Sequence, residues 1–155
     1  MALSRRDARE QAFVLLFEKT FNKDDSLETI IANAEEGRDI QVDSFALKLA
    51  AGFCDNSQAI DEQIEKNSTK WKMTRISRVA LSILRLSVYE LFFAEDIPDK
   101  VSINEAVELA KKFGTDDDSS FVNGVLGAVL RGRTGGEKPE TEVKNKNKNI
   151  DENKI

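Results

Sequence analysis

Three arginines near the start of the chain, Arg5, Arg6 and Arg9, have the residue type and spacing to bind an anion. Ser4, with Asp7 three residues later, predicts that a helix begins just before them. With 3.6 residues per turn, the three arginines lie within about a 100° arc of this helix. An anion there could bind both the arginines and the free amides of the first turn. The alternative is a solvated basic helix end, which would oppose the helix dipole by roughly 0.3–1 kcal/mol per charge.

A second candidate site lies at the turn before the last expected helix. The acidic run Asp116–Asp118 and the serines that follow it suit a helix N-terminus. The run could hold a hard cation, but it lacks the regular ligand spacing of a calcium loop. Capping of the helix is therefore the favoured interpretation. Phe121 lies at this helix start, where its side chain can face solvent.

The available side-chain chemistry favours a binding or assembly module over an enzyme. The chain has no histidine, the commonest general base and metal ligand. Cys54 is its single cysteine, so neither an intramolecular disulfide nor a cysteine zinc site can form. It also has no glycine-rich phosphate loop and no nucleophile elbow. We therefore predict no catalytic residue, no metal site and no cofactor.

The charge and hydropathy of the chain limit its partners. The net charge is −5, so any nucleic-acid site must be a local basic patch on an acidic body. No stretch is apolar over enough residues to span a bilayer, and no apolar signal core follows the first arginines. These features predict a cytoplasmic protein without a membrane partner.

The apolar residues recur with the helical period, and alternating β-branched runs are absent, which predicts an all-α protein. Helices are expected from Ser4, over Ser26–Glu36, for about five turns from Asp43 or Ser44, over Thr74–Phe93, from Val101, and after the acidic run up to Gly132. The helix over Thr74–Phe93 is apolar on more than one side, so we expect it to be central.

Several local features make sharper predictions. Ser102 and Glu105 have the spacing of a capping box, and Gly114 is a suitable left-handed stop for the same helix. Gly124 and Gly127 each cost roughly 1 kcal/mol against alanine inside a helix, so they predict that another backbone passes close by. Gly52 could kink its helix or let a neighbour approach.

Aromatic residues could form further contacts. Phe13, Phe17 and Phe21 form a second stripe on the first helix, which therefore sits centrally or offers one face to a partner. Trp71, between two lysines, could stack on a base or close one end of the core. After Gly132 the composition becomes polar and rich in lysine and asparagine. We predict one helical domain over residues 1–132 and a disordered tail over residues 133–155.

Three motifs resemble the NusB family of bacterial transcription antitermination proteins. The first is V-x-I-N-E-A-V-E-L-A-K-x-F-G, then a short acidic turn and F-V-N-G-V-L, which begins at Val101. The others are R-R-x-A-R-E from Arg5 and I-L-R-L-S-V-Y-E-L from Ile83. The resemblance covers residues 3–131. It implies a compact bundle of about six to seven helices in two subdomains.

The resemblance also implies a function. Members of this family bind the boxA element of ribosomal-RNA leader transcripts, together with the small-subunit ribosomal protein NusE, in an antitermination complex on RNA polymerase. Arg5, Arg6 and Arg9 match the family's RNA-contacting arginines. Phe121 matches an aromatic residue at the RNA site, beside Asp117. Cations for phosphate and an aromatic group for an unstacked base are what single-stranded RNA recognition requires.

The partner surface is implied in the same way, since Phe17 falls where the family places an aromatic residue near NusE. Two residues depart from the family pattern. Asp7 interrupts an arginine run that is longer in some members, and Ala80 stands where some members carry an acidic residue that faces NusE. The alternative function is a helical adaptor that binds protein only and does not bind RNA.

Overall fold

The computed structural model describes residues 3–38, 40–68 and 73–133, and these residues form seven α-helices, one short 3-10 helix and no strand. The helices are α1 (Arg5–Phe21), α2 (Leu27–Arg38), α3 (Ser44–Asp55), α4 (Ser57–Asn67), α5 (Arg78–Phe93), α6 (Asp99–Phe113) and α7 (Asp116–Gly132), with the 3-10 helix η1 (Met73–Arg75) before α5. The prediction of an all-α fold is confirmed. Trp71 and its neighbouring lysines lie outside the described residues.

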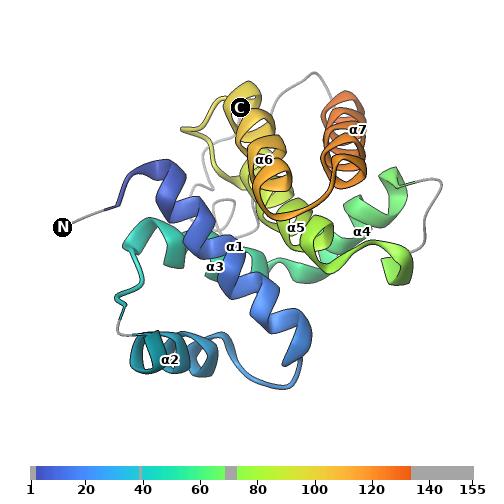
Figure 1. Cartoon of the computed structure of the whole chain (residues 1–155). Coiled ribbons are helices and arrows are strands. Elements are labelled where there is room, and N and C mark those ends of the chain that lie inside the picture. The colour runs from blue at the N-terminus through green and yellow to red at the C-terminus, as the bar shows by residue number, and fades with distance from the viewer. Residues whose placement is uncertain (1–2, 39, 69–72, 134–155) are drawn as a thin grey trace, which may run out of the picture.

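Helix α5 is the centre of the bundle, as its apolar sequence predicts. Every side chain from Leu86 to Leu91 is buried, and the helix packs against α1, α3, α4, α6 and α7. On one side α1, α2 and α3 pack together, and on the other α6 packs along α7 (Figure 1). Residues of α5 therefore connect the N-terminal helices to the C-terminal pair.

The long third helix expected from the sequence is two helices, α3 and α4. Asn56 ends α3 with a φ of −124° and its backbone amide bonds to the carbonyl of Phe53. The apolar face continues across this break, which is why periodicity alone did not reveal it. Gly52 allows a close approach of a neighbour, because a Cβ there would lie 2.3 Å from the ring of Tyr89 on α5.

The predicted capping box at the start of α6 is wrong. The helix begins four residues earlier, with Pro98 at the N-cap, and Ser102 donates a hydrogen bond to the buried Glu90 of α5 instead. Glu105 pairs with Arg6 of α1. Both side chains are therefore used between helices, because α6 packs against α5 and lies beside α1.

Gly114 ends α6 as predicted, but its predicted left-handed conformation is wrong, and so is the prediction made from Gly124 and Gly127. Gly114 is extended, with φ −120° and ψ −158°, and a Cβ there would meet the Asp118 carboxylate at 2.5 Å. It leads directly into Thr115, which caps α7 in a reciprocal capping box with Asp118. A Cβ added at Gly124 would meet nothing within 4 Å, and one added at Gly127 would meet only a side-chain atom of its own helix. Within the described part of the chain, no other helix brings its backbone close to either glycine.

Arg133, the first residue of the predicted tail, belongs to the described residues. Arg133 is buried and its guanidinium bonds to Asp99 and to the carbonyl of Leu91. The remainder of the predicted tail, residues 134–155, lies outside the described residues. None of the helices in the described part of the chain combines the length and apolarity needed to cross a bilayer.

Candidate nucleic-acid interface

The N-terminus of α1 presents two of the three arginines to solvent. The Ser4 hydroxyl accepts a hydrogen bond from the Asp7 amide at 3.0 Å, so the helix begins where the sequence predicts. The side chains of Arg5 and Arg6 are 57% and 66% exposed. Arg5 lies 4.0 Å above the ring of Phe45 on α3 and makes a long ion pair, at 3.9 Å, with the exposed Asp96.

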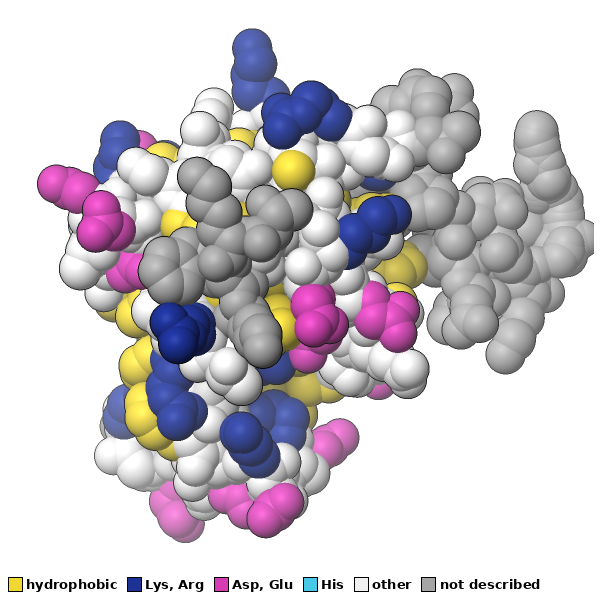
Figure 2. Space-filling view, turned by 90° about the vertical axis from the view of Figure 1, so that its right-hand side faces the viewer, with side chains coloured by type: hydrophobic (Ala, Val, Ile, Leu, Met, Phe, Trp, Pro, Cys, Tyr) yellow, Lys and Arg dark blue, Asp and Glu magenta, His cyan; other side chains and the backbone are white. Residues whose placement is uncertain are grey.

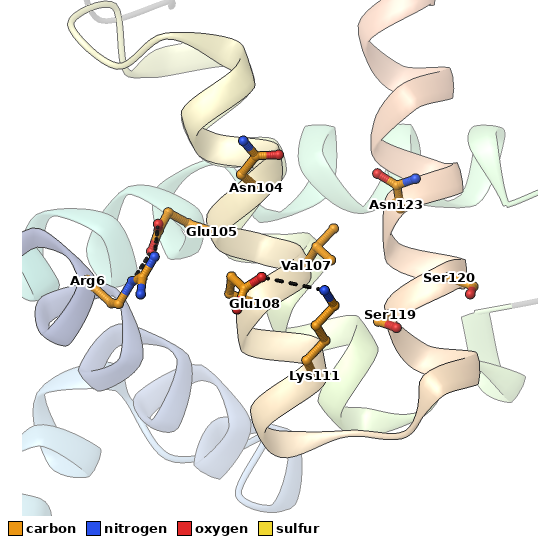
Figure 3. A pocket seen from close by; sticks show the side chains of 9 residues that line it. All are labelled: Arg6, Asn104, Glu105, Val107, Glu108, Lys111, Ser119, Ser120 and Asn123. Atoms are coloured by element: carbon orange, nitrogen blue, oxygen red, sulfur yellow. Dashed lines mark hydrogen bonds and ion pairs between the residues drawn. The ribbon is translucent and has the colours of Figure 1, made fainter.

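Arg6 makes a two-pronged ion pair with Glu105 of α6 (Figure 3). Its Nε donates to Oε1 at 3.0 Å and its Nη2 donates to Oε2 at 2.8 Å. This contact lowers the pKa of Glu105 and raises the pKa of Arg6. Because the arginine is largely exposed, an incoming phosphate could take the place of the carboxylate in the same two-pronged geometry.

Arg9 is placed differently from the expectation that it contacts RNA. Its side chain is 6% exposed and makes three hydrogen bonds to the carboxylate of Glu90, at 2.9 to 3.2 Å. Ser102 donates to the same carboxylate at 2.8 Å. One turn after Arg5 the face of α1 meets α5, so this arginine joins α1, α5 and α6 inside the bundle. A carboxylate within the apolar sequence of α5 is the signal that could have revealed this pair.

A polar groove of about 570 Å³ runs across α6 towards α7. Figure 3 shows the side chains that line it: Arg6, Asn104, Glu105, Val107, Glu108, Lys111, Ser119, Ser120 and Asn123. We call it the α6–α7 groove. Its two cations each face a carboxylate, since Lys111 lies 3.6 Å from Glu108. Amide and hydroxyl groups supply the remaining hydrogen-bonding capacity, which suits a polar ligand with both donors and acceptors.

Phe121 and Asp117 lie together, but in a different groove. They line a space of about 460 Å³ with Arg75, Ile76, Ser77, Ala80 and Asp118, called here the Phe121 groove. Phe121 is partly buried and Asp117 is exposed in the first turn of α7. Asp118 receives a hydrogen bond from Ser77, which joins this turn to the start of α5. The fold therefore brings the aromatic and acidic residues together, whereas Arg6 lines the α6–α7 groove.

Phe17 belongs to an aromatic surface. Its ring lies 5.8 Å from Phe13 and 5.1 Å from Phe21, and Phe13 also contacts Phe113 of α6 at 4.9 Å. Phe13 is buried and Phe17 is partly buried, whereas Phe21 and Phe113 are 58% and 38% exposed. We call Phe17, Phe21 and Phe113 the aromatic patch. Such a run from core to surface is typical of a protein contact.

Sequence reasoning missed a third groove, of about 620 Å³, between the end of α1 and the start of α5. Its cations are Lys19, Lys23, Arg78 and Arg85, and we call it the basic groove. These residues are not a cluster in the sequence, because Lys19 lies on α1, Lys23 in the turn that follows it, and Arg78 and Arg85 on the distant α5. In the sequence, the only signal of this groove is that Lys19 and Lys23, and likewise Arg78 and Arg85, are spaced so that each pair can share one side of its segment.

Comparison with known proteins agrees with this architecture. The sequence model of the NusB family matches residues 6–131. The chain is 45% identical to the transcription antitermination protein NusB of Clostridium novyi, over 83% of this chain and 99% of that protein. A NusB structure from T. maritima superposes with a TM-score of 0.76 at 36% identity, covering 86% of this chain and 94% of that one. A crystal structure of the antitermination factors NusB and NusE with double-stranded RNA has a TM-score of 0.74 at 27% identity, covering 83% of this chain and 97% of that one.

Proposed function

Because this chain belongs to the NusB family of transcription antitermination proteins, we propose that it binds the boxA element of ribosomal-RNA leader transcripts as a single strand. It does so together with NusE, in the cytoplasm, as part of an antitermination complex on RNA polymerase that supports processive transcription of ribosomal RNA. The similar crystal structure that holds NusB, NusE and double-stranded RNA supports both partners. The exposed pair of arginines at the start of α1 is the observation that carries the RNA part of this proposal.

Arg5 and Arg6 are the phosphate-binding residues of the proposal. Both guanidinium groups are exposed at a helix N-terminus, where free backbone amides favour an anion as well. A phosphate that approaches Arg6 exchanges one anionic partner for another, because Glu105 already occupies its fork. Arg9 has a different role in this proposal: it holds the helix in place from inside the bundle.

Phe121 is the proposed stacking residue, with Asp117 beside it. A partly buried aromatic ring in an open groove can stack an unpaired base, which contributes roughly 1–3 kcal/mol per base. The exposed carboxylate of Asp117 can accept a hydrogen bond from a base amino group. Together these residues favour an unpaired base over backbone contacts alone.

The aromatic patch is the proposed surface for NusE. Exposed aromatic rings in contact with one another give large apolar area at low entropic cost, and such residues dominate many protein interfaces. Phe17 lies at the boundary between core and surface, so it can connect a partner to the folded body of α1.

The experiment that tests this function measures binding of a short single-stranded boxA RNA, with and without NusE, by fluorescence anisotropy. We expect binding to the wild-type protein, tighter binding with NusE, and no comparable binding to an RNA of scrambled sequence. A protein that binds NusE but no RNA at any salt concentration would instead be the helical adaptor. The aromatic patch would be present in either case, so the RNA titration and not the patch distinguishes the two candidates.

A further inference from the structure

The basic groove carries an excess of positive charge in a protein whose net charge is −5. Among the described residues, its lining includes four cations, Lys19, Lys23, Arg78 and Arg85, against one carboxylate, Asp61. The end of α1 and the start of α5 lie on the right of Figure 1, which is the side that faces the viewer in Figure 2. Lys and Arg side chains gather in the lower left of that view, next to hydrophobic ones (Figure 2).

Hydrogen bonds hold most of these cations in place without cancelling their charge. Lys19 donates to the backbone carbonyl of Asp25 at 2.8 Å, and Arg78 donates to another backbone carbonyl. Both acceptors are neutral. Among the described residues, Arg85 alone of the four meets a carboxylate, that of Asp61, at 3.0 Å. Four positive charges less one negative charge leave three in the groove.

The α6–α7 groove differs in this respect. Its cations, Arg6 and Lys111, are matched by Glu105 and Glu108, so its formal charge is zero. A protein gains affinity for a polyanion when its Lys and Arg side chains neutralise phosphates and release the counterions condensed on them, and cations without a carboxylate partner are best able to do so. On this count the basic groove is better suited than the α6–α7 groove to hold a chain of phosphates.

The basic groove also adjoins the Phe121 groove. Ile76 lines both of them, and its chain neighbour Arg75 lines the Phe121 groove. If one base stacks on Phe121, the backbone of the same RNA strand can therefore continue past Arg75 to Arg78 in the basic groove. The floor of the basic groove includes apolar side chains, which give the bases of the strand a place to pack.

We propose that the basic groove is a second RNA-binding surface, which holds the phosphates of a single strand whose base stacks on Phe121. This inference rests on the proposed function, since it assumes that the protein binds RNA. A strand fits better than an acidic protein segment, because the cations lie along the groove, on α1, on the turn after it and on α5, and the groove adjoins an aromatic stacking residue. The basic groove lies at the end of α1, whereas Arg5 and Arg6 lie at its start, so the two surfaces are distinct.

The test compares Lys23→Gln/Arg78→Gln with Lys48→Gln/Lys100→Gln, which removes equal charge from exposed lysines that line none of the three grooves. A single-stranded boxA RNA of about 12 nucleotides, long enough to extend from one groove to the other, is titrated by fluorescence anisotropy at several salt concentrations. We expect the groove variant to lose roughly 0.7 of salt slope and roughly fivefold in affinity at 0.1 M salt per lost phosphate contact. The control should bind nearly as tightly as wild type. Circular dichroism checks folding, and Lys23→Glu alone serves if the Arg78 change unfolds the protein.

The outcomes separate this inference from the proposed function. If the groove variant binds RNA like the control while Arg5→Gln/Arg6→Gln loses affinity, the basic groove is not an RNA surface, although the proposed function stands. If the groove variant keeps RNA affinity but loses NusE, the surface binds protein and the inference is overturned. If wild-type protein binds no RNA at all, the proposed function fails first and this inference fails with it.

Discussion

Two arginines three residues apart on α1 make ion pairs of opposite kinds. Arg6 reaches Glu105 across the surface, with 66% of its side chain exposed, whereas Arg9 reaches Glu90 inside the bundle with 6% exposed. Both pairs have short contacts, at 2.8 and 2.9 Å. The difference shows that distance alone does not decide the role of an arginine. Burial makes Arg9 part of the fold, whereas exposure leaves Arg6 able to exchange Glu105 for a ligand.

The largest expected effect is on the buried pair. Arg9→Gln or Glu90→Gln leaves one charge inside the bundle without its partner, which should cost roughly 3–5 kcal/mol of unfolding free energy. Urea denaturation measures this. Asp61→Asn is the matched control at the partly exposed Arg85 pair and should cost much less. Equal losses at the two pairs would show that burial does not distinguish them.

The next effect concerns the ring of Phe121 and not a charge. Phe121→Ala should weaken RNA binding by roughly 1–3 kcal/mol, because it removes a stacking surface. The salt slope should remain almost unchanged, since no phosphate contact is lost. Anisotropy titrations at several salt concentrations give both quantities. A reduced slope would indicate that the variant also disturbs the cations beside the groove.

The exposed arginines should have the opposite signature. Arg5→Gln/Arg6→Gln should weaken RNA binding by roughly fivefold at 0.1 M salt and reduce the salt slope by roughly 0.7 for each lost contact with a single strand. The melting temperature should change little, because both side chains are exposed. Lys48→Gln/Lys100→Gln again provides the charge-matched control. Wild-type affinity with an unchanged slope would leave Arg5 and Arg6 as a solvated helix end.

The smallest effect is the pH dependence of the exposed pair. Arg6 holds the pKa of Glu105 below its usual range, so this carboxylate contributes stability above the pKa of an unfolded glutamate, about 4.3. That contribution is lost as the pH falls through the lowered pKa of the folded state. Arg6→Gln should therefore make stability slightly less dependent on pH below about 4.3. Urea denaturation between acidic and neutral pH would detect this, and an identical pH profile would contradict it.

Much of the fold was predictable because it depends on local chemistry. The Ser4 cap, the central α5 and the acidic start of α7 follow from capping groups and apolar periodicity, and the structure confirms each. The break between α3 and α4 was not predictable, because the apolar face continues across Asn56. The capping box at Ser102 was a false signal, since polar groups with capping spacing also bond to other helices.

The candidate site was predicted only in part, and the missing part is tertiary. Residue types and spacing identified Arg5, Arg6 and Phe121 and placed them on helix starts. Which groove each side chain lines depends on how α1 and α7 pack around α5 and α6. A helical wheel shows the faces of one helix and cannot predict this packing.

The sequence by itself determined the helices, the all-α class and the motifs that the family shares, because these depend on neighbours along the chain. The tertiary structure alone decided that Arg9 faces Glu90, that Arg6 meets Glu105, and that the basic groove exists. The physical reason is that burial and charge compensation are properties of the space between helices. A side chain acquires them only when residues far apart in the chain come together.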